Sequence, residues 1–290
     1  MKKYLALLML LTISLTSYGS QLQNETEVPA QFNTLFYVSS EPDGRLSRDI
    51  KESQRDNGVI LTNLNTEQYQ GKHPLQALIE QYGGSSFEKQ MDLEDLIVGK
   101  PWQIDMDEQE LVFDDDLLCS FQLLGTFSHS TKTWLWAWAN EQSDLPIDVI
   151  EQSFELKKYG EKNNIDLFKK AKFDATEDDL PIFGLIASGM FNSSGYYVAN
   201  FGSGTLVLTF NNKEIDQIHK KNDTHNRVAS VIPQLIANYD VNHYAAIKHY
   251  LLAKNYQITF DDGSKLIATK GNKQITAEFD NLSRLIGLKG

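Results

Sequence analysis

Three tryptophans alternate with apolar residues in the middle of this chain, in the stretch T-W-L-W-A-W-A-N from Thr133 to Asn140. Only 4 tryptophans occur among the 290 residues, so this spacing is a strong constraint on the fold. A repeat of two is the repeat of a β-strand, in which alternate side chains share one face. On a helix the same residues would step by about 200° and form no stripe. The pattern therefore predicts an interior strand that is apolar on both faces.

The three tryptophans, Trp134, Trp136 and Trp138, have two interpretations. Indoles bury large areas and most often serve as core residues. Alternatively, three rings on one face form a platform for a flat ligand such as a sugar or a base, with the amide of Asn140 at the mouth of the pocket. These four residues are the candidate ligand-binding residues, although capping is the more common role for an amide at the end of a strand.

The segments around this stretch predict an α+β fold, in which an antiparallel sheet packs against helices. Alternating apolar residues predict a meander, and the strands expected in it are 102–106, 110–113, 117–127 and 133–140. Helices are expected at 74–82, closed by Gly83-Gly84, at 87–98, from Pro146 to Gly160, and from Pro181 onwards. A hairpin within 195–210 follows them. Strands followed by helices and again by strands are typical of this fold class.

Composition divides the chain into four parts and a linker. Residues 1–19 are expected to be a signal peptide, 20–73 a polar N-terminal segment of uncertain fold, and 74–210 the α+β core domain with the Trp signature. The polar stretch 211–223 is the expected linker. Residues 224–290 are expected to form two helices and a β-meander, because apolar residues recur at helical spacing and two strong turns, Asp262-Gly263 and Gly271-Asn272, follow.

The leader predicts a periplasmic or secreted protein. Lys2 and Lys3 precede an apolar run, and Ser17 and Gly19 provide the small residues that precede a cleavage site, which is expected after Gly19. The alternative is a cytoplasmic protein whose first helix is apolar. The run is short for a membrane-spanning helix, so no integral membrane segment is expected once the leader is removed.

The net charge of -12 argues against a nucleic-acid partner, which would require a surface rich in Lys and Arg. With 1 cysteine, Cys119, no intramolecular disulfide can form, and its place among apolar residues predicts a buried, unreactive thiol.

No recognisable catalytic or metal-binding motif emerges from the polar residues, and no cofactor is expected. The acidic residues within 105–116 do not match a calcium-binding loop. Such a loop has Gly at its sixth position and Glu at its twelfth, where this chain has Glu110 and Asp116. None of the 6 histidines forms an H-E-x-x-H motif or an i, i+4 pair. Ser128-His129-Ser130 is better explained as a turn than as a nucleophile with its base. No catalytic residue and no metal ligand is therefore predicted.

Four sequence features together resemble a family of uncharacterised bacterial domains, over roughly residues 75–210. They are W-x-I-D at 102–105, the G-T-F-S and T-W-L-W-A-W-A-N hairpin, a helix that ends at Tyr159-Gly160, and an apolar helix with a Tyr-containing strand at 182–198. The resemblance implies no activity for this chain, because the family has no activity that could be transferred to it. Members usually lack a secretion signal, so the leader is a departure from the family.

These observations favour a non-catalytic extracytoplasmic binding or interaction module that takes an unknown small molecule or protein. One alternative is a hydrolase whose catalytic residues come from distant parts of the chain. Another is an immunity-like protein that binds one partner through an acidic face.

Overall fold

The computed structural model describes residues 73–290, with the exception of residues 98, 107 and 115. The predicted leader at 1–19 lies outside this range, as does the polar N-terminal segment apart from its last residue. Both stay predictions.

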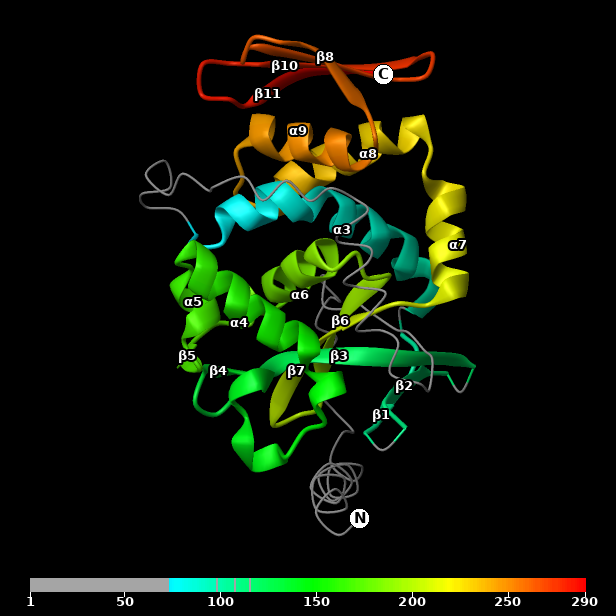
Figure 1. Ribbon diagram of the computed structural model, residues 1–290. Coiled ribbons are helices and arrows are strands. Elements are labelled where there is room, and N and C mark those ends of the chain that lie inside the picture. Colours follow the sequence, from blue (N-terminus) through cyan, green and yellow to red (C-terminus); the bar gives the residue numbers. More distant parts are fainter. Residues whose placement is uncertain (1–72, 98, 107, 115) are drawn as a thin grey trace, which may run out of the picture.

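Two antiparallel sheets enclose layers of helices, which confirms the α+β fold class. Figure 1 shows the C-terminal sheet at one end of the molecule, followed by α8 and α9, then α3, then α6, and finally the larger sheet. Helix α7 runs along one side of these layers. No described helix combines the length and apolar character needed to span a membrane.

The bounds of the elements follow the chain. The helices are α3 (Gln76–Ile97), α4 (Glu151–Asn163), α5 (Asp166–Lys169), α6 (Asp179–Met190), α7 (Lys213–Asn222), α8 (His225–Asn238) and α9 (His243–Ala253). The strands of the larger sheet are β1 (Trp102–Asp105), β2 (Glu110–Phe113), β3 (Leu117–Ser128), β4 (Thr133–Trp136), β5 (Lys172–Asp174), β6 (Gly195–Asn200) and β7 (Gly204–Phe210). The smaller sheet contains β8 (Gln257–Asp261), β9 (Lys265–Lys270), β10 (Lys273–Phe279) and β11 (Leu285–Lys289).

Strand β3 organises the larger sheet because it pairs with three other strands. Its first residues pair with β2, its last four pair with β4, and Phe121–Ser128 pairs with β7. The predicted meander and the predicted 195–210 hairpin are thus parts of one sheet. In the smaller sheet the order is β11-β10-β9-β8, which confirms the C-terminal pair of helices followed by a β-meander.

The Trp stretch is a strand only in its first half, so the predicted strand 133–140 was too long. β4 ends at Trp136, and residues 137–139 form a 3₁₀ turn, η2 (Ala137–Ala139). The backbone N–H of Trp138 donates to the hydroxyl of Ser153 on α4 at 3.3 Å instead of to a neighbouring strand. The strand gives way because β5, its partner on one edge, is only three residues long.

The first two indoles share one face, as predicted, and both lie in the core. Trp134 and Trp136 are 0% exposed, and their ring centroids are 5.2 Å apart. Gly125 on β3 pairs with Trp136, and a side chain at Gly125 would overlap the ring of Trp134. The glycine of the G-T-F-S motif is therefore required by this close approach.

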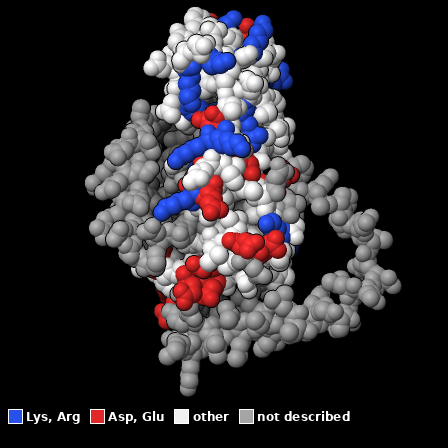
Figure 2. Space-filling view, turned by 90° about the vertical axis from the view of Figure 1, so that its right-hand side faces the viewer, with Lys and Arg blue, Asp and Glu red and all other residues white. Residues whose placement is uncertain are grey.

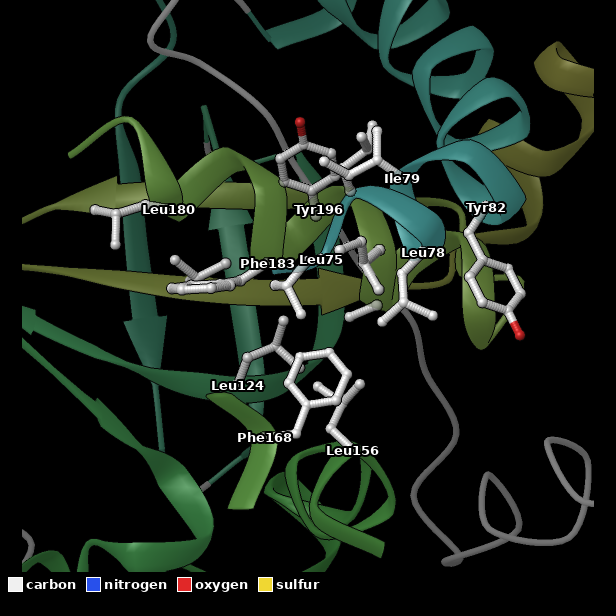
Figure 3. Close-up of a cluster of buried hydrophobic side chains, with 14 of the residues drawn as sticks. Leu75, Leu78, Ile79, Tyr82, Leu124, Leu156, Phe168, Leu180, Phe183 and Tyr196 are labelled. Carbon is white, nitrogen blue, oxygen red and sulfur yellow. The ribbon is translucent and has the colours of Figure 1, made fainter. Parts of the chain in front are cut away.

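A large apolar core lies between the larger sheet and the helices. Figure 3 shows Leu75, just before α3, beside Phe183 of α6 and Ile79 of α3 beside Tyr196 of β6, with Leu124 of β3 below them. A second cluster contains the buried Cys119, which confirms the prediction of a buried thiol. A third cluster fills the space between the smaller sheet, α8 and α9, and α3 also reaches it through the half-buried side chains of Phe87 and Met91.

The sequence predicted two helices at 74–82 and 87–98, but α3 is one helix of 22 residues. The pair Gly83-Gly84 does not end it. Instead, Gly84 lies where α9 crosses, and a Cβ atom there would be 2.6 Å from the Cβ of Tyr250. The two glycines permit close helix packing, and the apolar residues on either side of them face different neighbours.

Further boundaries differ from the prediction. The helix expected from Pro146 begins at Glu151, after a 3₁₀ turn at Ile147–Val149. Gly160 does not close the helix that follows Pro146, because α4 continues to Asn163 and Gly160 is buried against Phe168. The helix ends instead at Asn164, which adopts a positive φ of 55°. The expected linker 211–223 contains helix α7, whose N-terminus is capped by the side chain of Asn212.

We predict that Gly84→Ala destabilises the protein by about 1–3 kcal/mol, because the added methyl group must displace Tyr250 or α9. Alanine would normally stabilise a helix interior by about 1 kcal/mol relative to glycine. A loss of stability in Gly84→Ala, instead of a gain, would therefore indicate that the added methyl group has no room. The measurement is urea unfolding followed by circular dichroism. Ser85→Ala on the same helix is the control, and a Gly84→Ala protein as stable as that control would contradict the packing explanation.

Candidate functional site

The four residues proposed from sequence do not form an open platform. The rings of Trp134 and Trp136 are fully enclosed, and Nε1 of Trp136 donates a hydrogen bond to the backbone oxygen of Leu167 at 2.8 Å. Trp138 lies on η2 and is half-buried, with the Nζ atom of Lys157 4.5 Å from its ring centroid. Asn140 is also half-buried, and its backbone N–H donates to Ala137 at 3.1 Å. In this arrangement the first two indoles are core residues and cannot contact a ligand from solvent.

The polar residues that the structure does bring together lie around α3. We define the α3 polar cluster as the set of side chains that connect the acidic residues of α3 with α7, α8, α9 and β9. Its members are Glu88, Asp92, His219, Asn222, Asp223, Arg227, Tyr250, Lys254 and Lys270.

Asp92 is the first centre of this cluster. Its carboxylate is almost fully buried, with 2% of the side chain exposed. It accepts hydrogen bonds from Nδ1 of His219 at 2.9 Å, from Nδ2 of Asn222 at 2.9 Å and from a guanidinium nitrogen of Arg227 at 2.6 Å. A buried carboxylate requires such compensation, because an unpaired charge in the interior is costly. Asp92 thus joins α3 to both α7 and α8.

Glu88, one helical turn before Asp92, is the second centre. Nζ of Lys254 lies 2.7 Å and 2.8 Å from its two carboxylate oxygens, and the hydroxyl of Tyr250 donates to it at 3.0 Å. Burial, and then the charge of Glu88, raise the pKa of Tyr250 well above its usual range, so the phenol stays protonated and donates. Lys254 also contacts Asp223, which follows α7. Glu88 thereby ties α9 to α3.

The hydrogen bonds of His219 decide what chemistry the cluster can perform. Its Nδ1 atom faces the carboxylate of Asp92, and its Nε2 atom lies 2.8 Å from the backbone oxygen of Ser194. Both ring nitrogens are thus occupied by hydrogen bonds within the protein, and neither is directed at a site that a substrate could enter. The contact between His219 and Asp92 resembles half of a catalytic triad but holds helices together.

Lys89, also on α3, faces the loop between α6 and β6. Its Nζ atom donates to the backbone oxygen of Ser193 at 2.6 Å and to the side-chain oxygen of Asn192 at 3.1 Å. Burial of the amino group lowers the pKa of Lys89 to about 8, and the charges of Asp216 and Glu88 oppose this shift. A lysine with this pKa is a candidate nucleophile in principle. Here its hydrogens are directed at the loop, which it fixes in place.

A second contact between a histidine and a carboxylate lies at the start of α6, where Nε2 of His73 is 3.3 Å from Asp179. Nδ1 of His73 accepts the backbone N–H of Leu75, so this ring also has both nitrogens engaged. The hydrogen bond from His73, together with those from Thr176, lowers the pKa of Asp179 to about 2 despite its partial burial.

Across residues 73–290, apart from the three that are not described, no three His, Cys, Asp or Glu side chains could hold a metal ion.

A buried amide network lies beneath α4 in the larger sheet. The side-chain oxygen of Gln122 accepts the backbone N–H of Gln152 at 3.0 Å, and the hydroxyl of Thr209 donates to the side-chain oxygen of Gln152. Ser153 donates to the backbone oxygen of Leu124 at 2.9 Å. These bonds fix α4 on β3 and β7. They satisfy polar groups that the apolar surroundings would otherwise leave unpaired.

Sequence reasoning missed the α3 polar cluster because its members are far apart in the chain. Glu88 and Asp92 were assigned to a helix of low apolar regularity, and His219 was placed in a linker. One local signal was present: two acidic residues four positions apart lie on one face of a helix, next to the apolar residues Phe87 and Met91. Acidic residues so close to an apolar face indicate buried ion pairs, but their partners cannot be found without the tertiary fold.

Comparison with known proteins finds one family model that is similar to the first part of the described chain. Residues 76–213 match the model of a family of unknown function, DUF6882. This match confirms the predicted resemblance to a domain family without known activity. It begins at the start of α3 and ends at the start of α7, so α8, α9 and the smaller sheet lie beyond it. Searches of curated proteins and of solved structures returned no match.

We predict that Asp92→Asn lowers the free energy of unfolding by about 3–5 kcal/mol, because His219 and Arg227 lose the charge that compensates their burial. Guanidinium unfolding of the full chain measures this change. The matched control is Glu177→Gln, which breaks the exposed pair with Lys132 and should cost at most about 1 kcal/mol. Equal losses in the two variants would show that the cluster does not hold α7 and α8 on α3.

Proposed function

We propose that this chain is a non-catalytic binding protein that acts outside the cytoplasm and presents its C-terminal sheet to a protein partner. The observation that carries the proposal is the exposure of apolar side chains on both edge strands of this sheet. Phe260 on β8 is 44% exposed and Ile286 on β11 is 69% exposed, and Leu282, in the turn before β11, is 66% exposed. An exposed apolar side chain on an edge strand is available to a partner segment that pairs with that edge.

The edge strands offer a way to bind an extended segment of a partner. Within the described part of the chain, β8 and β11 each pair with only one neighbour. An unpaired strand edge provides backbone donors and acceptors that a partner strand can use, while neighbouring apolar side chains give specificity. The ion pairs of the α3 polar cluster hold this unit against the DUF6882 domain, so the surface is presented from a rigid support.

The hydrolase alternative has weaker support. The two contacts between a histidine and a carboxylate, at His219 and at His73, use both nitrogens of each ring for structural bonds. Neither contact involves Asn140. The immunity-like alternative also involves binding a protein partner, but through an acidic face, and the apolar residues on the sheet favour the first proposal.

A capture experiment tests the proposed binding surface. The full chain is immobilised and exposed to an envelope extract of the source organism, and captured proteins are identified by mass spectrometry. We expect one protein to be retained by the wild type and lost with Phe260→Glu or Ile286→Glu, because a charge at either position opposes burial. The control is Ile147→Glu in the DUF6882 domain, where Ile147 is 65% exposed.

Two results would contradict the proposal. One is a partner whose capture is unaffected by both substitutions in the sheet. The other is turnover of an ester, peptide or glycoside substrate by the purified chain, which would favour the hydrolase alternative.

The location outside the cytoplasm depends on the predicted leader and has its own test. We expect N-terminal sequencing of the protein isolated from the envelope or the medium to begin at Ser20, because cleavage is expected after Gly19. A protein that retains Met1 and fractionates with the cytoplasm would disprove this part of the proposal without affecting the binding surface.

A further inference from the structure

Helix α7 carries charges of opposite sign at its two ends. Its buried side is formed by Ile215, which is 2% exposed, and by His219 of the α3 polar cluster. On the other side Glu214, Gln217 and Lys221 are exposed, at positions i, i+3 and i+7. Residues at this spacing lie in one row along a helix. The exposed row is thus acidic near the N-terminus of the helix, neutral in its middle and basic near its C-terminus.

The neighbours of α7 extend this pattern at both ends. At its N-terminus, the side chain of Asn212 donates to the backbone oxygen of Leu118 at 3.3 Å, which places the helix beside the turn with the exposed residues Asp114 and Asp116. At its C-terminus, Asp223 lies 3.5 Å from Lys270.

Lys270 is paired in register with Lys273 across the β9–β10 turn. Lys220, Lys221 and Lys273 form no ion pair with any described residue.

Figure 2 shows this side of the molecule with Lys and Arg gathered over its upper part and Asp and Glu mainly lower down. The difference is also present in the sequence. Residues 211–290 contain 11 Lys and Arg against 8 Asp and Glu, although the whole chain has a net charge of -12. A single protein face with a basic half and an acidic half is complementary to itself after rotation by 180°.

We propose that two copies of this chain associate through α7, with the two helices antiparallel around a two-fold axis near Gln217. In this arrangement Glu214 of one copy faces Lys221 of the other, and the opposite pair repeats the contact. The acidic turn at Asp114 and Asp116 meets the basic region formed by Lys220, Lys270 and Lys273. Antiparallel helix dipoles add to the attraction. Leu118, which is 49% exposed, supplies apolar surface next to the acidic end of the helix.

The observations favour a second copy over a nucleic acid. A polyphosphate backbone is uniformly negative and would be repelled by Glu214, Asp114 and Asp116 on the same face.

Two charges oppose the proposed pairing of the two copies and limit its strength. Lys213 is exposed next to Glu214, and Lys100 lies 3.3 Å from Asp114. Both reduce the negative potential at the acidic end without reversing it.

Sedimentation velocity of the full chain tests this association. At about 0.05 M salt we expect a dimer, and at about 0.5 M salt we expect the dissociation constant to rise by about tenfold or more, since the screening length falls from about 14 Å to about 4 Å. The triple variant Lys220→Glu/Lys221→Glu/Lys273→Glu should be a monomer at low salt. The variant Glu214→Lys/Asp114→Lys/Asp116→Lys should be a monomer as well.

Mixing the two variants provides the decisive measurement. One variant carries an acidic face and the other a basic face, so an equimolar mixture should form a heterodimer although each variant alone is monomeric. The control Lys162→Glu/Lys170→Glu/Lys172→Glu changes the charge by the same amount on exposed lysines of α4 and the α5–β5 segment, and should stay dimeric. Circular dichroism confirms that every variant is folded.

Three results would overturn the proposal: a wild-type chain that is monomeric at low salt, a dimer that survives both triple substitutions, or a mixture of variants that stays monomeric. Because these measurements use purified chain alone, they are independent of the partner capture that tests the C-terminal sheet.

Discussion

Burial of two carboxylates on one helix is the interaction on which the arrangement of this molecule depends. Glu88 and Asp92 lie on α3, the helix of the matched region on which the C-terminal unit packs, where a charge without a partner is costly. Their partners come from α7, α8 and α9. The elements beyond the family match are therefore held in one orientation, since apolar packing alone would tolerate small rotations that ion pairs with fixed geometry do not.

The helix α3 also serves more than one apolar core. Its first turns face α6 and the larger sheet, while Phe87 and Met91 reach the core under the smaller sheet. This double role explains its sequence. A helix that packs on several sides has no single apolar stripe, and close neighbours demand small residues such as Gly84.

The parts of the fold that the sequence predicted well are those governed by local rules. Alternation identified the strands around β3, and the turn residues located the C-terminal hairpins. The errors occurred where tertiary contacts override such rules. Gly83-Gly84 and Gly160 resemble helix ends in sequence, but Gly84 accommodates Tyr250 and Gly160 accommodates Phe168. The polar residues of 211–223 resemble a linker, yet Ile215 and His219 anchor a helix.

At the candidate site, local sequence rules were even less able to reveal tertiary contacts. The tryptophans were recognisable from their spacing, but spacing alone could not decide whether Trp134 and Trp136 face solvent or the core. The α3 polar cluster joins residues more than 100 positions apart in the chain, such as Asp92 and His219, so no local pattern could reveal it.

The end of the family match within α7 has a consequence for related proteins. A DUF6882 domain that stopped near residue 213 would lack the groups that neutralise Glu88 and Asp92, and both carboxylates would then have to face water. A carboxylate that faces water needs no partner, so positions 88 and 92 constrain their neighbours only where an appended unit covers α3.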